Sequence, residues 1–129
     1  MYLGFERLPQ PISALVNGDA FGAGCVAAYS ADLRIASHAA RFAMPETGIG
    51  LFPDVGGGWY LPRKPGEIGM WLALTGARLK AADCLIAGIA THYMPTEILS
   101  AARAQIAGAA QTHNAENALA SGLDALSES

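Results

Sequence analysis

Two carboxylates, Glu46 and Asp54, lie close together in a segment that is otherwise apolar and rich in glycine and proline. Each follows a proline directly, and because proline fixes its own φ, each acid is attached to a backbone with little torsional freedom. Charged groups in an apolar setting are costly, and proteins tolerate them mostly where shifted pKa values serve chemistry. The pair therefore indicates acid–base or nucleophilic catalysis. The alternative is structural: Asp54 would be the N-cap of a helix over 55–61, and Glu46 would lie in a turn.

A glycine-rich turn upstream offers a second chemical feature. Ile12–Val16 reads as a buried strand that ends at a turn, Gly22–Gly24 opens a small-residue helix over 25–31, and a second strand follows over 32–37. A helix start after such a turn presents free backbone N–H groups to an anion. No lysine follows and the spacing is not GxGxxG, so the expected anion is a developing oxyanion rather than a nucleotide phosphate. The alternative is that glycine only lets the helix pack closely.

Taken together, these motifs resemble the crotonase (enoyl-CoA hydratase/isomerase) superfamily in order and spacing. The resemblance covers about residues 5–95, and its most specific part is the Pro-Glu to Pro-Asp-Val-Gly-Gly segment. It implies one partial domain over 1–129, of α/β class, with a crotonase-like ββα spiral core and helices over 96–129. The residues that carry it are Asn17-Gly18, Gly22–Cys25, Asp32–Ser37, Phe42, Pro45-Glu46, Gly50–Gly57, Leu74–Gly76, Ala82-Asp83 and Ala87–Tyr93.

The resemblance also implies residue roles. Members of the superfamily bind an acyl-CoA thioester and stabilise negative charge on its carbonyl oxygen with two backbone N–H groups. Here Gly22 and Ala23 would line that oxyanion site, with the N–H of Ala23 as one donor, provided that Ala23 has a negative φ. Glu46 would act as general base or attack the carbonyl itself. Asp54 would help to bind a substrate hydroxyl or handle a proton.

One departure separates two branches of the superfamily. Val26 stands where typical hydratases carry a second catalytic glutamate, and valine cannot ionise. The valine thus argues against a hydratase. The segment from Pro45 to Gly57, followed by Gly88–His92, most resembles the branch that hydrolyses a 3-hydroxyacyl-CoA thioester in valine breakdown, and this resemblance implies the expected activity. Two alternatives stay open: a hydratase or isomerase that uses Glu46 with another partner, and a chain without catalytic activity.

The resemblance places the second oxyanion N–H and much of the acyl-CoA surface before Met1, as in the middle of a longer enzyme. We therefore expect little activity from these 129 residues alone, and exposed apolar surface, because 52% of the residues are hydrophobic. The expected partners are an acyl-CoA and either a second copy or a complementing chain. A net charge of −3 gives no reason to expect nucleic acid, and no apolar run is long enough for a membrane span.

The remaining residues that could take part in chemistry are expected to have structural roles. Cys25 and Cys84 read as ordinary buried thiols, and the three histidines show no ligand spacing, so no metal and no cofactor beyond the CoA of the substrate is expected. Trp59, Tyr60 and Trp71 are expected to pack in a core. No targeting segment is visible, which leaves a cytoplasmic or mitochondrial location open.

The second half of the chain reads as helical. Helices are expected over 65–74, ended by Gly76, over 80–87, over 95–110 and, weakly, over 115–126. A short strand is expected over 89–93.

Overall fold

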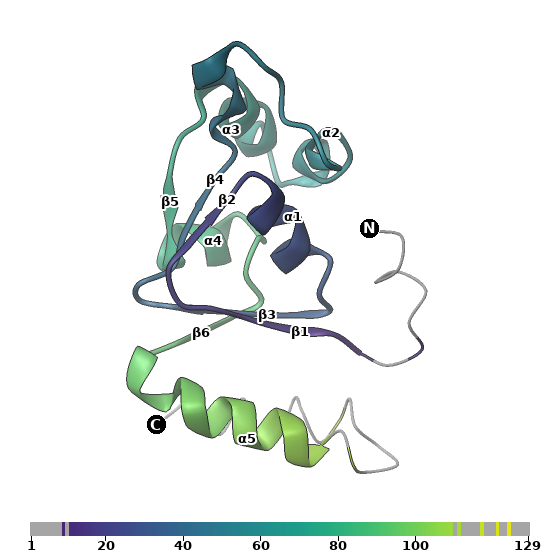
Figure 1. The fold of residues 1–129 in the computed structure, drawn as a ribbon, viewed down its shortest axis with the longest axis vertical. Helices are drawn as coiled ribbons and strands as arrows, with labels where there is room; N and C mark the ends of the chain where they lie inside the picture. Colours follow the sequence, from purple (N-terminus) through teal and green to yellow (C-terminus); the bar gives the residue numbers. More distant parts are fainter. Residues whose placement is uncertain are drawn as a thin grey trace.

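The computed structural model describes residues 9, 11–109, 111, 117, 121 and 124, and it contains two small sheets (Figure 1). The first sheet is parallel, with the order β1-β3-β6. Its strands are β1 (Ser13–Val16), β3 (Leu33–Ser37) and β6 (His92–Met94). All three overlap strands that the sequence predicts: β1 and β3 each start one residue later than expected, whereas β6 is shifted toward the C-terminus relative to the predicted range 89–93.

The second sheet has the order β2-β4-β5, with β2 (Asp19–Phe21), β4 (Arg41–Ala43) and β5 (Leu79–Lys80). β2 and β4 are parallel, so that Phe21 pairs with Ala43, whereas β4 and β5 are antiparallel. The sequence does not predict these strands, because two or three residues are too short to show an alternating pattern.

Helices connect and cover the sheets. They are α1 (Ala23–Tyr29), α2 (Gly57–Tyr60), α3 (Ile68–Thr75), α4 (Ala81–Ile86) and α5 (Leu99–Ala109), with the 3₁₀ turns η2 (Pro45–Ile49), η3 (Leu61–Arg63) and η4 (Thr96–Ile98). The predicted helices over 80–87 and 95–110 are present with shorter bounds, and the one expected over 65–74 starts later, at Ile68. The weak helix expected over 115–126 falls outside the described residues, apart from positions 117, 121 and 124.

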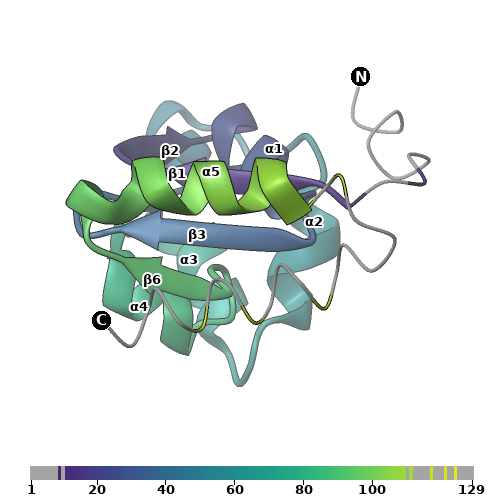
Figure 2. The same ribbon diagram turned by 90° about the horizontal axis from the view of Figure 1, so that it is seen from below.

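Two hydrophobic clusters lie on opposite faces of the first sheet. α5 lies over one face, alongside β1 and β3 (Figure 2). On this face Ile35 and Met94 pack against Ala102 and Ala109. The larger cluster includes residues of β4, α1, α3 and α4, among them Phe42, Met44, Leu72 and Cys84.

The aromatic residues divide between this core and the surface. Tyr60 is 2% exposed and stacks on Tyr29 with a centroid separation of 4.5 Å, as expected of a core residue. Trp59 and Trp71 are 62% and 50% exposed, so the prediction that they pack in the core is wrong. Each precedes a buried residue, Tyr60 or Leu72, and adjacent helical positions point in different directions.

Candidate functional site

The candidate site lies where β2 and β4 end. In parallel pairs the carboxyl ends of neighbouring strands lie at the same edge, and ligands of α/β proteins bind beyond that edge. β2 leads into α1 (Figure 1), with Gly22 between them. Met44 connects β4 to η2. The backbone N–H of Gly22 donates to the carbonyl of Ala43 at 3.1 Å. The pairing of two short strands thus brings the glycine turn and the Pro-Glu segment together.

Gly22 fits the close approach of a carboxylate. Its φ is +51°, and a Cβ placed on it would lie 3.1 Å from Oε1 of Glu46. Any other residue would combine a left-handed backbone with a tight contact to that oxygen. The glycine therefore does more than allow a helix to pack on a sheet, which was the alternative interpretation.

Ala23 is the first residue of α1. Because the first N–H groups of a helix have no partner within it, the N–H of Ala23 is available to a ligand as far as the helix is concerned. Val55 is the one non-glycine residue with positive φ in the described part of the chain, so Ala23 meets the expected condition of a negative φ.

Glu46 lies in the first turn of η2 and is half-buried. Its Oε2 atom is buried and has no hydrogen-bond partner among the described residues. Glu46 thus lies in a turn, as the structural alternative expected, but the N-cap of that turn is Met44, and no side chain makes a cap bond there. An unpartnered buried carboxylate oxygen is costly, and such groups are found mostly where a ligand or reaction uses them.

The surroundings of Glu46 hold two further titratable groups. Burial, and to a lesser degree the nearby charge of Glu46, raises the pKa of the Cys25 thiol to about 12. Burial in the same region, with smaller contributions from Cys25 and Glu46, raises the pKa of Tyr60, whose buried hydroxyl has no partner among the described residues. Both groups therefore stay protonated at neutral pH.

Asp54 is in a different environment. It is exposed, and its carboxylate makes no hydrogen bond or ion pair within the described part of the chain; its backbone carbonyl accepts a bond from the N–H of Gly57 at 2.7 Å. Gly56 is the N-cap of α2, so the N-cap interpretation of Asp54 is wrong. Val55 and Gly56 have φ values of +42° and +98°, and this left-handed turn delays the helix start.

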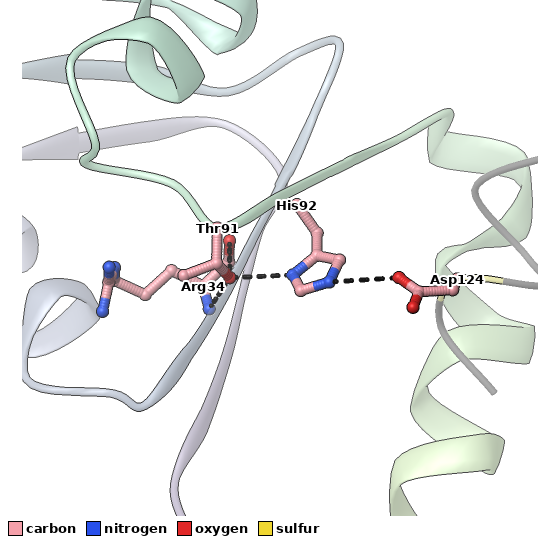
Figure 3. A network of polar contacts seen from close by, with 4 residues as sticks. All are labelled: Arg34, Thr91, His92 and Asp124. Carbon is pink, nitrogen blue, oxygen red and sulfur yellow. Dashed lines mark hydrogen bonds and ion pairs between the residues drawn. The ribbon is translucent and has the colours of Figure 1, made fainter. Parts of the chain in front are cut away.

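A separate polar network joins β3 to β6 (Figure 3). The hydroxyl of Thr91 accepts from the N–H of Arg34 at 2.8 Å and donates to its carbonyl at 3.0 Å. His92 places Nδ1 2.9 Å from that hydroxyl and Nε2 3.8 Å from a carboxylate oxygen of Asp124. Because the Thr91 hydroxyl is committed to the Arg34 backbone, this hydroxyl–histidine–carboxylate arrangement supports the sheet rather than a nucleophile.

A hollow of about 300 Å³ lies among Phe52, Pro53, α2 and α3. Two further findings concern metal binding and membrane insertion. Among the residues that the structure describes, no group of three His, Cys, Asp or Glu side chains could hold a metal ion. No helix in the described ranges has the length and apolarity to cross a membrane.

Comparison with known proteins identifies the class. The sequence profile of the enoyl-CoA hydratase/isomerase family matches residues 3–129, so the chain belongs to that family. An enoyl-CoA hydratase from Rhodobacter sphaeroides superposes with a TM-score of 0.78 at 38% identity, covering 86% of this chain and 34% of that one. An enoyl-CoA hydratase/isomerase from Cupriavidus metallidurans gives 0.80 at 29%, covering 96% and 49%. These matches confirm the partial α/β crotonase fold.

Several curated relatives share the name of one hydrolase of the family. The chain is 53% identical over 88 residues to mitochondrial 3-hydroxyisobutyryl-CoA hydrolase of Xenopus tropicalis, a match that spans 68% of this chain and 23% of that protein. The human protein of the same name is 50% identical over 91 residues, 70% of this chain and 24% of the relative. The chain thus spans about a quarter of the length of these relatives.

Proposed function

We propose that these residues form part of the thioester-cleaving site of a 3-hydroxyisobutyryl-CoA hydrolase. One observation carries the proposal: an oxygen of the half-buried Glu46 carboxylate lies against Gly22, at the start of α1, while the other oxygen is buried without a partner among the described residues. Identity of about half to hydrolases over two thirds of the chain supports the choice within the family.

The reaction would run at the ends of β2 and β4. The thioester carbonyl oxygen would accept a hydrogen bond from the N–H of Ala23, which stabilises the charge of the tetrahedral intermediate. Glu46 would either take a proton from the attacking water or attack the carbonyl carbon itself. In the first route, the C–S bond of the tetrahedral intermediate breaks, the acid is released, and the CoA thiolate takes up the proton that Glu46 removed from water. In the second route, breaking the C–S bond leaves a mixed anhydride on Glu46; water then cleaves this anhydride, which releases the acid, restores the carboxylate and supplies the proton for the thiolate. The second oxyanion donor is not assigned among these residues.

Asp54 would help to select the substrate, and Val26 would exclude hydration as the reaction. An exposed carboxylate can accept a hydrogen bond from the hydroxyl of a 3-hydroxyacyl group, or handle a proton during turnover, which suits Asp54. Val26, on α1, cannot ionise, so the paired carboxylates that hydrate a double bond are not available at that position.

No cofactor beyond the CoA of the substrate is part of this proposal, and neither a metal nor a nucleic acid is needed. The relatives are named as mitochondrial, which supports a mitochondrial location if the source is a eukaryote. For a bacterial source the proposed location is the cytoplasm. A second copy or a complementing chain is the proposed protein partner.

The test is a comparison of products. The full product of the gene is purified and given 3-hydroxyisobutyryl-CoA or an unsaturated acyl-CoA, and two quantities are followed: free thiol and the absorbance of the conjugated double bond. Hydrolysis releases thiol from the first substrate and leaves the absorbance of the second unchanged. Loss of that absorbance without thiol release would instead indicate hydratase or isomerase chemistry, the alternative that the solved hydratases favour. Neither signal would indicate a chain without catalytic activity.

A further inference from the structure

The two halves of the proposed site come from different strands, so their relative position needs a fixed connection. Gly22 and Ala23 follow β2, whereas Glu46 follows β4. Neither strand exceeds three residues, and such short ladders offer few backbone bonds to hold a register.

Cys25 provides bonds beyond the ladder. Its thiol lies within hydrogen-bond distance of two backbone carbonyls, that of Ala20 in β2 and, at 3.0 Å, that of Ala43 in β4. Its backbone N–H also donates to the carbonyl of Gly22 at 3.0 Å. One residue of α1 thus contacts the middle of β2, the end of β4 and the glycine turn, and it is completely buried.

The carbonyl of Ala43 is the central point of this arrangement. It accepts from the Cys25 thiol and from the N–H of Gly22, and it lies at the end of β4, directly before the Met44–Glu46 segment. A shift of α1 relative to β4 would break both bonds and would change the distance between the Ala23 N–H and Glu46.

We propose that Cys25 is a positioning residue that holds the Ala23 N–H and the Glu46 carboxylate in register by sharing its one thiol proton between the backbone carbonyls of Ala20 in β2 and Ala43 at the end of β4. This inference rests on the proposed function.

The state of the thiol agrees with a donor role. Because burial raises the pKa of Cys25 to about 12, the thiol carries its proton throughout the range in which an enzyme would be assayed. A thiolate could not donate to a carbonyl.

Cys84 offers a matched control. It is a buried free thiol like Cys25, belongs to the same hydrophobic cluster and lines the same cavity of about 30 Å³. Its thiol makes no hydrogen bond to a strand end in the described part of the chain. Cys25→Ala and Cys84→Ala therefore remove the same atoms from the same core, but only the first removes the bonds to Ala20 and Ala43.

The kinetic experiment compares Cys25→Ala, Cys25→Ser and Cys84→Ala in the full product of the gene, with thiol release from 3-hydroxyisobutyryl-CoA as the signal. We expect kcat to fall about tenfold in Cys25→Ala with little change in KM, because a small misplacement of reacting groups costs rate rather than binding. Cys25→Ser keeps a donor and should recover most of kcat, and Cys84→Ala should stay near wild type. Equal losses in the two alanine variants, or no recovery with serine, would overturn the inference.

A second readout is independent of turnover and separates this inference from the proposed function. Amide hydrogen exchange at Gly22 reports on its bond to the Ala43 carbonyl. Exchange should be faster in Cys25→Ala than in wild type and unchanged in Cys84→Ala, even if no acyl-CoA is hydrolysed; unchanged exchange in both would refute the positioning role. If Cys25→Ala does not fold, Cys25→Val, which restores volume but no donor, is compared with Cys25→Ser in the same way.

Discussion

The two halves of the Pro-Glu to Pro-Asp region look alike in sequence but differ in packing. Phe42 and Met44, just before Glu46, are 4% and 0% exposed, whereas Ile49 and Phe52, just before Asp54, are 77% and 74% exposed. Glu46 thus extends from a packed strand end, and Asp54 lies on a surface turn. The difference shows that a proline before an acid does not set its environment; the packing of the preceding residues does.

The largest effect on stability is expected when a phenylalanine ring is removed from the packed half, and the same change in the exposed half is its control. Phe42→Ala should lower the free energy of unfolding by about 3–5 kcal/mol, because it removes a buried ring from the core. Phe52→Ala should change it by no more than about 0.5 kcal/mol and should reduce self-association, because it removes an exposed apolar group. Urea denaturation and sedimentation measure the two quantities. Comparable destabilisation by both variants would refute the contrast.

A smaller effect is expected where α3 supports the packed half. Gly76 ends α3 with φ +63°, and a Cβ placed on it would lie 3.2 Å from Cα of Pro45. Gly76→Ala should therefore cost about 1–2 kcal/mol of unfolding free energy from the left-handed backbone, with a further penalty from the contact.

The control for this variant is Gly58→Ala in α2. A Cβ there meets nothing within 4 Å, and the residue does not have a positive φ. Its unfolding free energy should rise by about 0.4–1 kcal/mol, because alanine restricts the unfolded chain. Loss of stability in Gly58→Ala equal to that in Gly76→Ala would mean that neither the left-handed backbone of Gly76 nor its contact with Pro45 is the cause.

The smallest effect on stability is expected at Asp54. Asp54→Asn should leave the free energy of unfolding within about 0.5 kcal/mol, because the carboxylate is exposed and makes no hydrogen bond or ion pair with the described residues. If Asp54 binds the substrate hydroxyl, kcat/KM should nonetheless fall roughly 10- to 100-fold, as loss of a charged hydrogen bond costs about 1.5–3 kcal/mol. If the Asp54→Asn variant kept the kcat/KM of the unmodified enzyme, Asp54 would not be part of the site.

Part of this arrangement could be predicted from the sequence. The strands around Leu15 and Ile35 and the helix ended by Gly76 have clear apolar runs and stop signals, and the crotonase resemblance drew attention to Gly22 and Glu46. The approach of Glu46 to Gly22 could not be predicted from the residues alone, because it depends on the pairing of two strands of three residues each.

Other features depend on conformations that no sequence signal announces. Val55 is β-branched and would be expected to avoid the left-handed region that it occupies. For this reason the sequence predicts neither the late start of α2 nor Gly56, rather than Asp54, as its N-cap. The bonds of Cys25 to Ala20 and Ala43 are tertiary, and a lone cysteine in an apolar run gives no hint of them.

The central claim, that Glu46 at the end of β4 performs the chemistry, is tested most directly by one measurement. Thiol release from 3-hydroxyisobutyryl-CoA is compared between the full product of the gene and its Glu46→Gln variant, with unfolding midpoints recorded for both. The amide keeps the shape of the side chain but can act neither as base nor as nucleophile, so the rate should fall by at least about 10²–10⁴ at an unchanged midpoint. A variant that folds normally and releases thiol at a rate near that of the unmodified enzyme would contradict the account.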